Sequence, residues 1–304
     1  MTRSRNAAAL EMLAMLNSRF FPALALLLAT SLLAACAPQR PATAEEIVAA
    51  ERAFAADGYA QGVKASFLAY SAADAIVFSP DPQNAQAVFG AAPDADPDKP
   101  APHLIWWPLY AGAARSGDLG FTTGPYAIED DRRGHYFTIW KKQADGRWKW
   151  VLDAGVGADA AAEAAQGTPV AFLDTSGFGA ASPEAAMEEV AAIERNIAEA
   201  AAIDVSSAYE PYLDIDSRLH SKGPPPAKTP QGRDAVFAAR PSSLEFSSLG
   251  GGASDAGDFV WTYGEGRSRE GDLSRTGYYI RVWQKRAAGW RLVFDEFLPP
   301  PDGR

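Results

Sequence analysis

Side chains able to take up or release a proton are scarce on the predicted inner faces of this chain. Chemistry of that kind usually needs a carboxylate or an imidazole, often beside a tyrosine or a protonated acid that stabilises an oxyanion. His135 is the only imidazole that strand periodicity places on an inward face. A single histidine at the start of a strand is more often a hydrogen-bonded spectator. His135 and Tyr59 are therefore candidates only, and we expect no catalytic residue.

The carboxylates near the predicted strands have structural interpretations. Asp118 and Asp258 each follow a glycine just before a strand, a position typical of turns. Asp153 and Asp295 each close a strand, and their recurrence in both halves of the chain favours a structural role. The inward register of the predicted strands contains no aspartate or glutamate. The sequence therefore shows no acid–base pair.

Other kinds of site find little support. One cysteine in 304 residues excludes a disulfide framework and every multi-cysteine metal site. Asp94, Asp96 and Asp98 resemble the start of a calcium loop, but the required glycine and the closing glutamate are missing. No glycine-rich phosphate loop follows a strand, and no nucleophile elbow is present. With a net charge of −10, nucleic acid is a poor partner. We expect no metal, no cofactor and no nucleic-acid partner.

The amino terminus has the pattern of an export signal. A basic stretch precedes an uncharged, mostly apolar run over 20–35, which is short for a membrane span but suits the apolar part of a signal peptide. The run ends Leu33-Ala34-Ala35-Cys36, and this resembles the bacterial lipoprotein signal, in which the cysteine becomes the lipid-modified first residue. The alternatives are an ordinary signal peptide cut at a small-residue site, or a buried cysteine in a core helix. Translation starts at Met1 or at Met15.

The lipoprotein resemblance implies a location. Residues 1–35 would be removed, and Cys36 with the tether to Thr43 (36–43) would hold the folded part at a membrane. Ala37 follows the cysteine instead of the aspartate associated with retention at the inner membrane. We therefore expect a periplasmic protein that its lipid anchors to the outer membrane of a Gram-negative bacterium.

The remaining chain reads as a tandem repeat. Residue types recur at offsets that drift only between 140 and 143 positions, and such consistency over a whole domain is hard to produce by chance. The recurring pairs include Glu51 and Glu194, Gly117 and Gly257, Tyr136 and Tyr279, Trp140 and Trp283, and Asp153 and Asp295. We predict a first unit over 44–156, a linker over 157–186, a second unit over 187–298 and a tail over 299–304.

Each unit is predicted to open with a helix and to end with strands. Thr43 followed by Glu46 forms a capping box, and Ser182-Pro183 supplies a helix cap with proline at the first helical position. Residues 136–143 and 148–153 read as a hairpin across Asp145-Gly146, and residues 279–285 and 290–295 repeat it. Helices followed by antiparallel strands indicate an α+β fold.

Period-two alternation divides each strand into two faces. His135, Phe137 and Ile139 share one face, and Tyr278, Ile280 and Val282 match them in the second unit. Thr138 and Arg281, on the opposite face, are expected to meet solvent or a partner. We assign the apolar face to the interior and predict that it lines a ligand pocket. The predicted lining residues are Phe121, His135, Phe137, Trp261, Tyr278 and Ile280.

A family resemblance rests on two strings of the first unit. Ser116–Tyr126 (SGDLGFTTGPY) and Ile139–Asp153 (IWKKQADGRWKWVLD) resemble the SnoaL-like branch of the nuclear transport factor 2-like superfamily, and the second unit keeps a weaker version of both. The resemblance implies two tandem cone-shaped units, each a curved antiparallel sheet wrapped on N-terminal helices with a pocket at its wide end. It does not decide function, because the superfamily includes isomerases, dehydratases, cyclases and members without a known reaction.

Three functional hypotheses follow. The first is non-catalytic binding of a small apolar ligand or of a protein partner. The second is an isomerase, dehydratase or cyclase that uses His135, or an unrecognised carboxylate, with Tyr59. The third is a structural role in which the two units pack through their sheets as an internal pseudo-dimer.

Overall fold

A computed structural model describes residues 42–94, 96, 98, 101–271 and 273–300. The predicted signal peptide and the predicted lipid-attachment residue Cys36 lie outside the described residues. The described residues belong to one compact body. Among the described residues, no helix is both long and apolar enough to cross a membrane.

The first unit is an eight-stranded sheet with three helices. The helices are α3 (Ala42–Gln61), α4 (Val63–Tyr70) and α5 (Ala85–Ala91). The strands are β1 (Ser71–Phe78), β2 (Pro82–Asn84), β3 (Leu104–Trp106), β4 (Tyr110–Ala113), β5 (Leu119–Ile128), β6 (Asp131–Lys142), β7 (Trp148–Gly157) and β8 (Ala171–Phe172). Their order is β2-β1-β7-β6-β5-β4-β8, with β3 paired to β5. The predicted linker thus supplies β8 to the first sheet.

The second unit repeats this plan with five strands. Its helices are α6 (Pro183–Ala201), α7 (Val205–Tyr209) and α8 (Arg233–Ala238), with short 3₁₀ turns η1 (Glu210–Tyr212) and η2 (Pro230–Gly232). Its strands are β9 (Leu213–Ser221), β10 (Glu245–Ala253), β11 (Phe259–Glu270), β12 (Leu273–Arg286) and β13 (Gly289–Leu298), in the order β10-β11-β12-β13-β9.

The two sheets share one topology. In each, the strand that follows the first helices lies parallel beside the second strand of the hairpin, β1 beside β7 and β9 beside β13. All other strand pairs within β5–β7 and β10–β13 are antiparallel. The predicted α+β fold with two tandem curved sheets and N-terminal helices is confirmed.

Local sequence accounts for where these elements begin and turn. The Ser182 side chain accepts a hydrogen bond from the Ala185 amide, and Pro183 begins α6, as predicted. The first hairpin turns at Gly146 and the second at Gly289, with φ of 81° and 97°. Most residues avoid this left-handed region, so glycine suits both turns.

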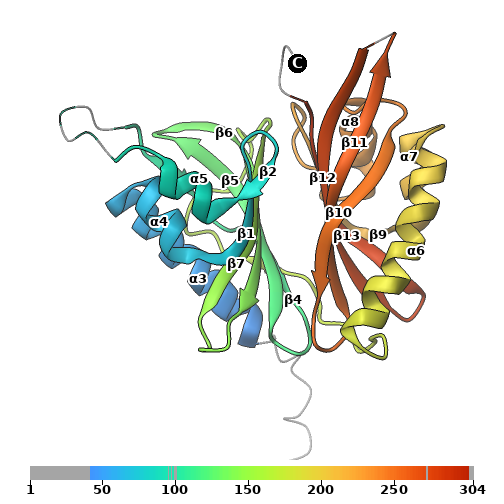
Figure 1. Cartoon of the computed structure of the whole chain (residues 1–304), viewed down its shortest axis with the longest axis horizontal. Helices are drawn as coiled ribbons and strands as arrows, with labels where there is room; N and C mark the ends of the chain where they lie inside the picture. Colours follow the sequence, from blue (N-terminus) through green and yellow to red (C-terminus); the bar gives the residue numbers. More distant parts are fainter. Residues whose placement is uncertain (1–41, 95, 97, 99–100, 272, 301–304) are drawn as a thin grey trace, which may run out of the picture. The chain divides into compact units, whose positions relative to one another are not determined.

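The helices and the sheets form layers within this body (Figure 1). Helices α3–α5 cover the outer face of the first sheet and α6–α8 that of the second, while the inner faces of the two sheets meet. The rings of Phe137 and Phe294, one from each sheet, stack with centroids 3.7 Å apart. Phe121 and Phe259 also stack across the junction, at 6.0 Å. One hydrophobic core therefore contains residues of both units.

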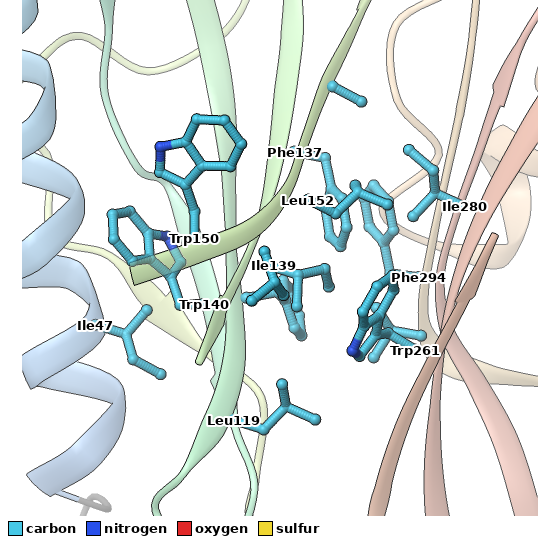
Figure 2. Close-up of a cluster of buried hydrophobic side chains, with 14 of the residues drawn as sticks. Ile47, Leu119, Phe137, Ile139, Trp140, Trp150, Leu152, Trp261, Ile280 and Phe294 are labelled. Atoms are coloured by element: carbon cyan, nitrogen blue, oxygen red, sulfur yellow. The ribbon is translucent and has the colours of Figure 1, made fainter. Parts of the chain in front are cut away.

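The strand face assigned to the interior of each cone faces the other sheet instead. Figure 2 shows Phe137 and Ile139 on the side of the second sheet, whereas Trp140 and Trp150 lie on the side of α3. The expectation that Thr138 and Arg281 meet solvent or a partner is wrong, because both are fully buried. Each sheet is covered on both faces, so alternation alone cannot tell which face meets the helices.

Candidate functional site

A cavity of about 170 Å³ lies between the helices and the sheet of the first unit. Helices α3 and α4 supply Phe54 and Phe67, which meet edge to face at 4.8 Å. The sheet supplies the remaining walls. Its lining residues are Leu104, Trp106, Tyr126, Tyr136, Asp153, Ala154 and Gly155. The walls are thus mostly aromatic, with one carboxyl group among them.

Asp153 supplies that carboxyl group. It lies on β7 directly opposite Thr138 of β6, whose hydroxyl donates a hydrogen bond to Oδ1 at 2.6 Å. Burial raises the pKa of Asp153 to about 8; the Thr138 hydrogen bond lowers it, and the Glu51 carboxylate raises it further. At neutral pH the Asp153 carboxyl is therefore mostly protonated and can donate a hydrogen bond.

Tyr136 adds a second hydroxyl to the same wall. Its side chain is buried, and its hydroxyl makes no hydrogen bond of ordinary geometry to the described residues. Burial, and then the Glu51 carboxylate, hold the pKa of Tyr136 well above 10.0, while the neighbouring Thr122 hydroxyl lowers it. An unsatisfied buried hydroxyl costs free energy, which a ligand able to accept its hydrogen bond would recover.

Glu51 anchors α3 to the sheet rather than facing a ligand. Its carboxylate accepts hydrogen bonds from Trp106 Nε1 at 2.6 Å, from Trp140 Nε1 at 3.0 Å and from the Thr122 hydroxyl. Burial raises its pKa, and these hydrogen bonds lower it. In the second unit Glu194 accepts the corresponding hydrogen bonds from Thr262 and Trp283, and a third from Tyr279. The repeated glutamate thus has a structural role in both units.

The same region of the second unit is filled by side chains. Arg281 lies opposite Asp295, as Thr138 lies opposite Asp153, and Phe297 lies opposite Tyr279, as Gly155 lies opposite Tyr136. The second unit therefore carries a long cation and an aromatic ring where the first carries a threonine and a glycine. Both Arg281 and Phe297 are buried.

Arg281 is surrounded by acidic and aromatic side chains. Its guanidinium lies 3.4 Å from Asp295 Oδ2 and 3.5 Å from Glu194 Oε1, and it donates to the Tyr209 hydroxyl at 2.6 Å. The guanidinium carbon also lies 3.9 Å from the centre of the Tyr279 ring. A second buried arginine, Arg240, pairs with Asp295 Oδ1 at 2.6 Å.

The candidates predicted from the sequence lie elsewhere. His135 is buried at the junction of the units, where its Nε2 lies 3.4 Å from Glu163 Oε1 and its ring 5.3 Å from that of His220. Tyr59 is 55% exposed and stacks on His103 at 4.3 Å. Neither lines the cavity that contains Asp153.

The predicted pocket residues are divided between the junction core and its edge. Phe121, Phe137 and Ile280 are fully buried in the core shared by the two sheets. Trp261 belongs to the same core and also lines a groove of about 310 Å³. Tyr278 donates a hydrogen bond to Asp81 at 3.0 Å. The structure does not bring this set together around one cavity.

The sequence interpretation assigned Asp153 a structural role, and the structure places it in the wall of this cavity. Its recurrence as Asp295 favoured a structural role, and Asp295 does have one in binding two arginines. The signal that could have distinguished the two is the residue opposite each aspartate, since Thr138 cannot neutralise a carboxylate and Arg281 can. Among the residues described, no group of three or more His, Cys, Asp or Glu could hold a metal ion.

Comparisons with known proteins place the chain by structure only. No family profile matches the sequence, and no curated protein matches it either. A solved NTF2-like protein of unknown function from Shewanella oneidensis MR-1 is 16% identical over 36% of this chain and 97% of its own, with a TM-score of 0.30. Another, from Pseudomonas putida KT2440, is 12% identical over 40% and 92%, with a TM-score of 0.34.

A third solved structure has the same character. It is an NTF2-like protein with a cystatin-like fold from Novosphingobium aromaticivorans, 16% identical over 39% of this chain and 83% of its own, with a TM-score of 0.31.

Proposed function

We propose that the first unit binds a small, mostly apolar molecule in the cavity beside Asp153, and that the second unit supports it. The observation that carries this proposal is the pair of buried O–H groups, on Asp153 and Tyr136, in a cavity otherwise walled by apolar side chains. Such a combination is typical of ligand sites. A cavity of about 150 Å³ can hold benzene, so this one, of about 170 Å³, suits a ligand built around one ring.

The proposed support comes from the junction of the sheets. Phe137 and Phe294 stack there, and several hydrogen bonds join the loops at one end of the two sheets. The Arg115 amide donates to Asp258 at 2.8 Å, and the Asp255 amide donates to Asp118 at 3.1 Å. These reciprocal contacts support an internal pseudo-dimer, in which each unit covers the face that the other would expose to water.

We also propose that the protein is a periplasmic lipoprotein of the outer membrane. The Leu33-Ala34-Ala35-Cys36 string after an apolar run supports this, as does Ala37 after the cysteine. Mass spectrometry of the mature amino terminus tests it. A diacylated or triacylated Cys36 is the expected result, and an unmodified thiol would reject the anchor.

The binding proposal is tested by ligand-induced stabilisation. Ring-sized apolar probes are screened against the full chain by thermal shift, and a ligand at 100 times its Kd raises stability by about 2.7 kcal/mol. Gly155→Phe copies Phe297 of the second unit and should abolish the shift by filling the cavity. Gly146→Asn, in the exposed hairpin turn, is the matched control and should retain it. A shift that survives Gly155→Phe would place the ligand elsewhere.

The pKa of Asp153 favours a second function, acid–base catalysis. A carboxyl with a pKa of about 8 exchanges its proton near neutral pH, as a general acid or base must. Asp153 could take a proton from the carbon between a ligand carbonyl and a C=C double bond and return it to the far carbon of that double bond, which shifts into conjugation, while the Tyr136 hydroxyl donates to the carbonyl oxygen. Asp153→Asn should then abolish turnover and retain binding.

A further inference from the structure

Both units contain the same pair of acidic residues, one aspartate and one glutamate, but they differ in whether an arginine lies beside the pair. In the second unit Asp295 and Glu194 share the Arg281 guanidinium, and Arg240 also pairs with Asp295. In the first unit no ion pair within the described part of the chain involves Asp153 or Glu51. Burial of an acidic group without a counter-charge is costly, so the first unit keeps a wall whose natural complement is a cation.

Glu51 and Asp153, the two carboxyl groups of the first unit, differ in how many hydrogen-bond donors they contact. Glu51 accepts three hydrogen bonds, from Trp106, Trp140 and Thr122. Among the described residues, Asp153 accepts one hydrogen bond, from Thr138, at Oδ1. Asp153, which lines the cavity, therefore keeps more acceptor capacity than Glu51 does.

Aromatic rings surround the cation in the second unit and the empty space in the first. The Arg281 guanidinium carbon lies 3.9 Å from the Tyr279 ring centre, 4.5 Å from that of Phe246 and 5.1 Å from that of Tyr209. The cavity of the first unit is walled by Phe54, Phe67, Trp106, Tyr126 and Tyr136. Aromatic faces beside a carboxylate are the usual surroundings of a bound organic cation.

We propose that the ligand of the first unit is a small organic cation, an amidine, guanidine or amine attached to an apolar group. Its charged head takes the place against Asp153 that the Arg281 guanidinium takes against Asp295. This inference rests on the proposed function, since it names the chemical class of the ligand for the same cavity. Thr138 and Gly155 leave the space that Arg281 and Phe297 fill in the second unit.

A cationic ligand must displace the proton of Asp153. Because burial raises the pKa of Asp153 to about 8, binding of a cation near neutral pH should release up to about one proton. A neutral ligand that accepts a hydrogen bond from the protonated carboxyl should release none. Proton release therefore separates the two classes of ligand.

The experiment compares benzamidine with its neutral isostere benzamide by isothermal titration of the full chain. At pH 8 we expect benzamidine to bind at least about tenfold more tightly, because its hydrogen bonds to a carboxylate are charge-assisted. Between pH 6 and pH 8 its affinity should rise by about tenfold or more, as the Asp153 carboxylate becomes populated. Titrations in buffers of different ionisation enthalpy should show proton release with benzamidine and none with benzamide.

Two variants make the result specific. Asp153→Asn should remove the preference for benzamidine and the proton release, so that benzamidine and benzamide bind with similar affinity. Asp145→Asn, in the exposed turn of the same hairpin, is the control and should change neither.

Three outcomes would overturn one or both proposals. If benzamide binds as tightly as benzamidine at every pH, the inference of a cation is wrong and the proposed cavity stands. A preference for benzamidine that persists in Asp153→Asn also overturns the inference. If neither probe binds, and apolar probes such as benzene also fail to bind, both the inference and the proposed function are wrong.

Discussion

Replacing Asp153 by asparagine should make the folded protein less sensitive to pH. The amide is nearly isosteric with the carboxyl, and its oxygen can still accept the hydrogen bond from the Thr138 hydroxyl. The substitution therefore removes one titrating group and leaves the cavity its shape. Any change in the dependence of stability on pH then reports the titration of Asp153.

The expected magnitude follows from the shift in pKa. Asp153 has a raised pKa in the folded protein, about 8 against an ordinary 3.8, so between these values the folded state binds more protons than the unfolded state. The contribution of Asp153 to the free energy of unfolding is fully present below pH 3.8. It decreases as pH rises toward 8, by up to about 1.4 kcal/mol per pH unit. Between pH 5 and pH 7 the loss is therefore at most about 3 kcal/mol, which is two pH units at this limiting slope.

Urea unfolding of both proteins at pH 5, 6, 7 and 8 measures this effect. The free energy of unfolding of Asp153→Asn, minus that of the unmodified protein, should increase steadily with pH. Buried groups that do not interact with Asp153, such as His220, titrate in both proteins and cancel in the difference. Glu296 does not cancel fully, because the Asp153 charge raises its pKa. A difference that stays constant from pH 5 to pH 8 would refute the raised pKa and the protonated state deduced from it.

Three further substitutions test the contrast between the units and their shared core. Thr138→Arg should place a guanidinium against Asp153, abolish benzamidine binding in isothermal titration and remove the pH dependence due to Asp153. Arg281→Thr removes a buried cation from beside Glu194 and Asp295 and should lower the free energy of unfolding by about 3–5 kcal/mol in urea. Phe294→Ala removes the ring stacked on Phe137 and should cost about 3–5 kcal/mol in the same assay.

Each of these substitutions has an outcome that contradicts its premise. Benzamidine binding by Thr138→Arg would show that the cation does not occupy the space opposite Asp153. A loss below about 1 kcal/mol for Arg281→Thr would indicate that Arg240 alone neutralises the acidic wall. Two separate unfolding transitions in Phe294→Ala, one for each unit, would show that the sheets do not depend on a common core.

The sequence predicted where helices, strands and turns lie more accurately than it predicted what each strand face packs against. The capped start of α6 and the hairpin turns at Gly146 and Gly289 follow from local chemistry, and the structure confirms them. The assignment of strand faces depended on long-range packing. Alternation along 136–142 separates two faces correctly, but both are buried, one against helices and one against the second sheet. The face with Thr138 and Trp140 was therefore assigned to the wrong layer.

The candidate site was missed for the same reason. Once Phe137 was assigned to the pocket, Thr138 and Asp153 fell on the outside, and no carboxylate remained on the inside. The contrast between Thr138 and Arg281 was present in the sequence as one pair in the repeat. Its meaning required knowing that Asp153 and Asp295 lie opposite these residues in the sheets.

The filled interior of the second unit has a consequence for how two joined copies of one unit can diverge in sequence. In a symmetric assembly of two identical chains, a substitution that closes one cavity closes both, so every copy must stay open for any to work. Covalent joining of two copies removes this constraint. One copy can then acquire a side chain such as Arg281 and stiffen, while selection for binding acts on the other copy alone.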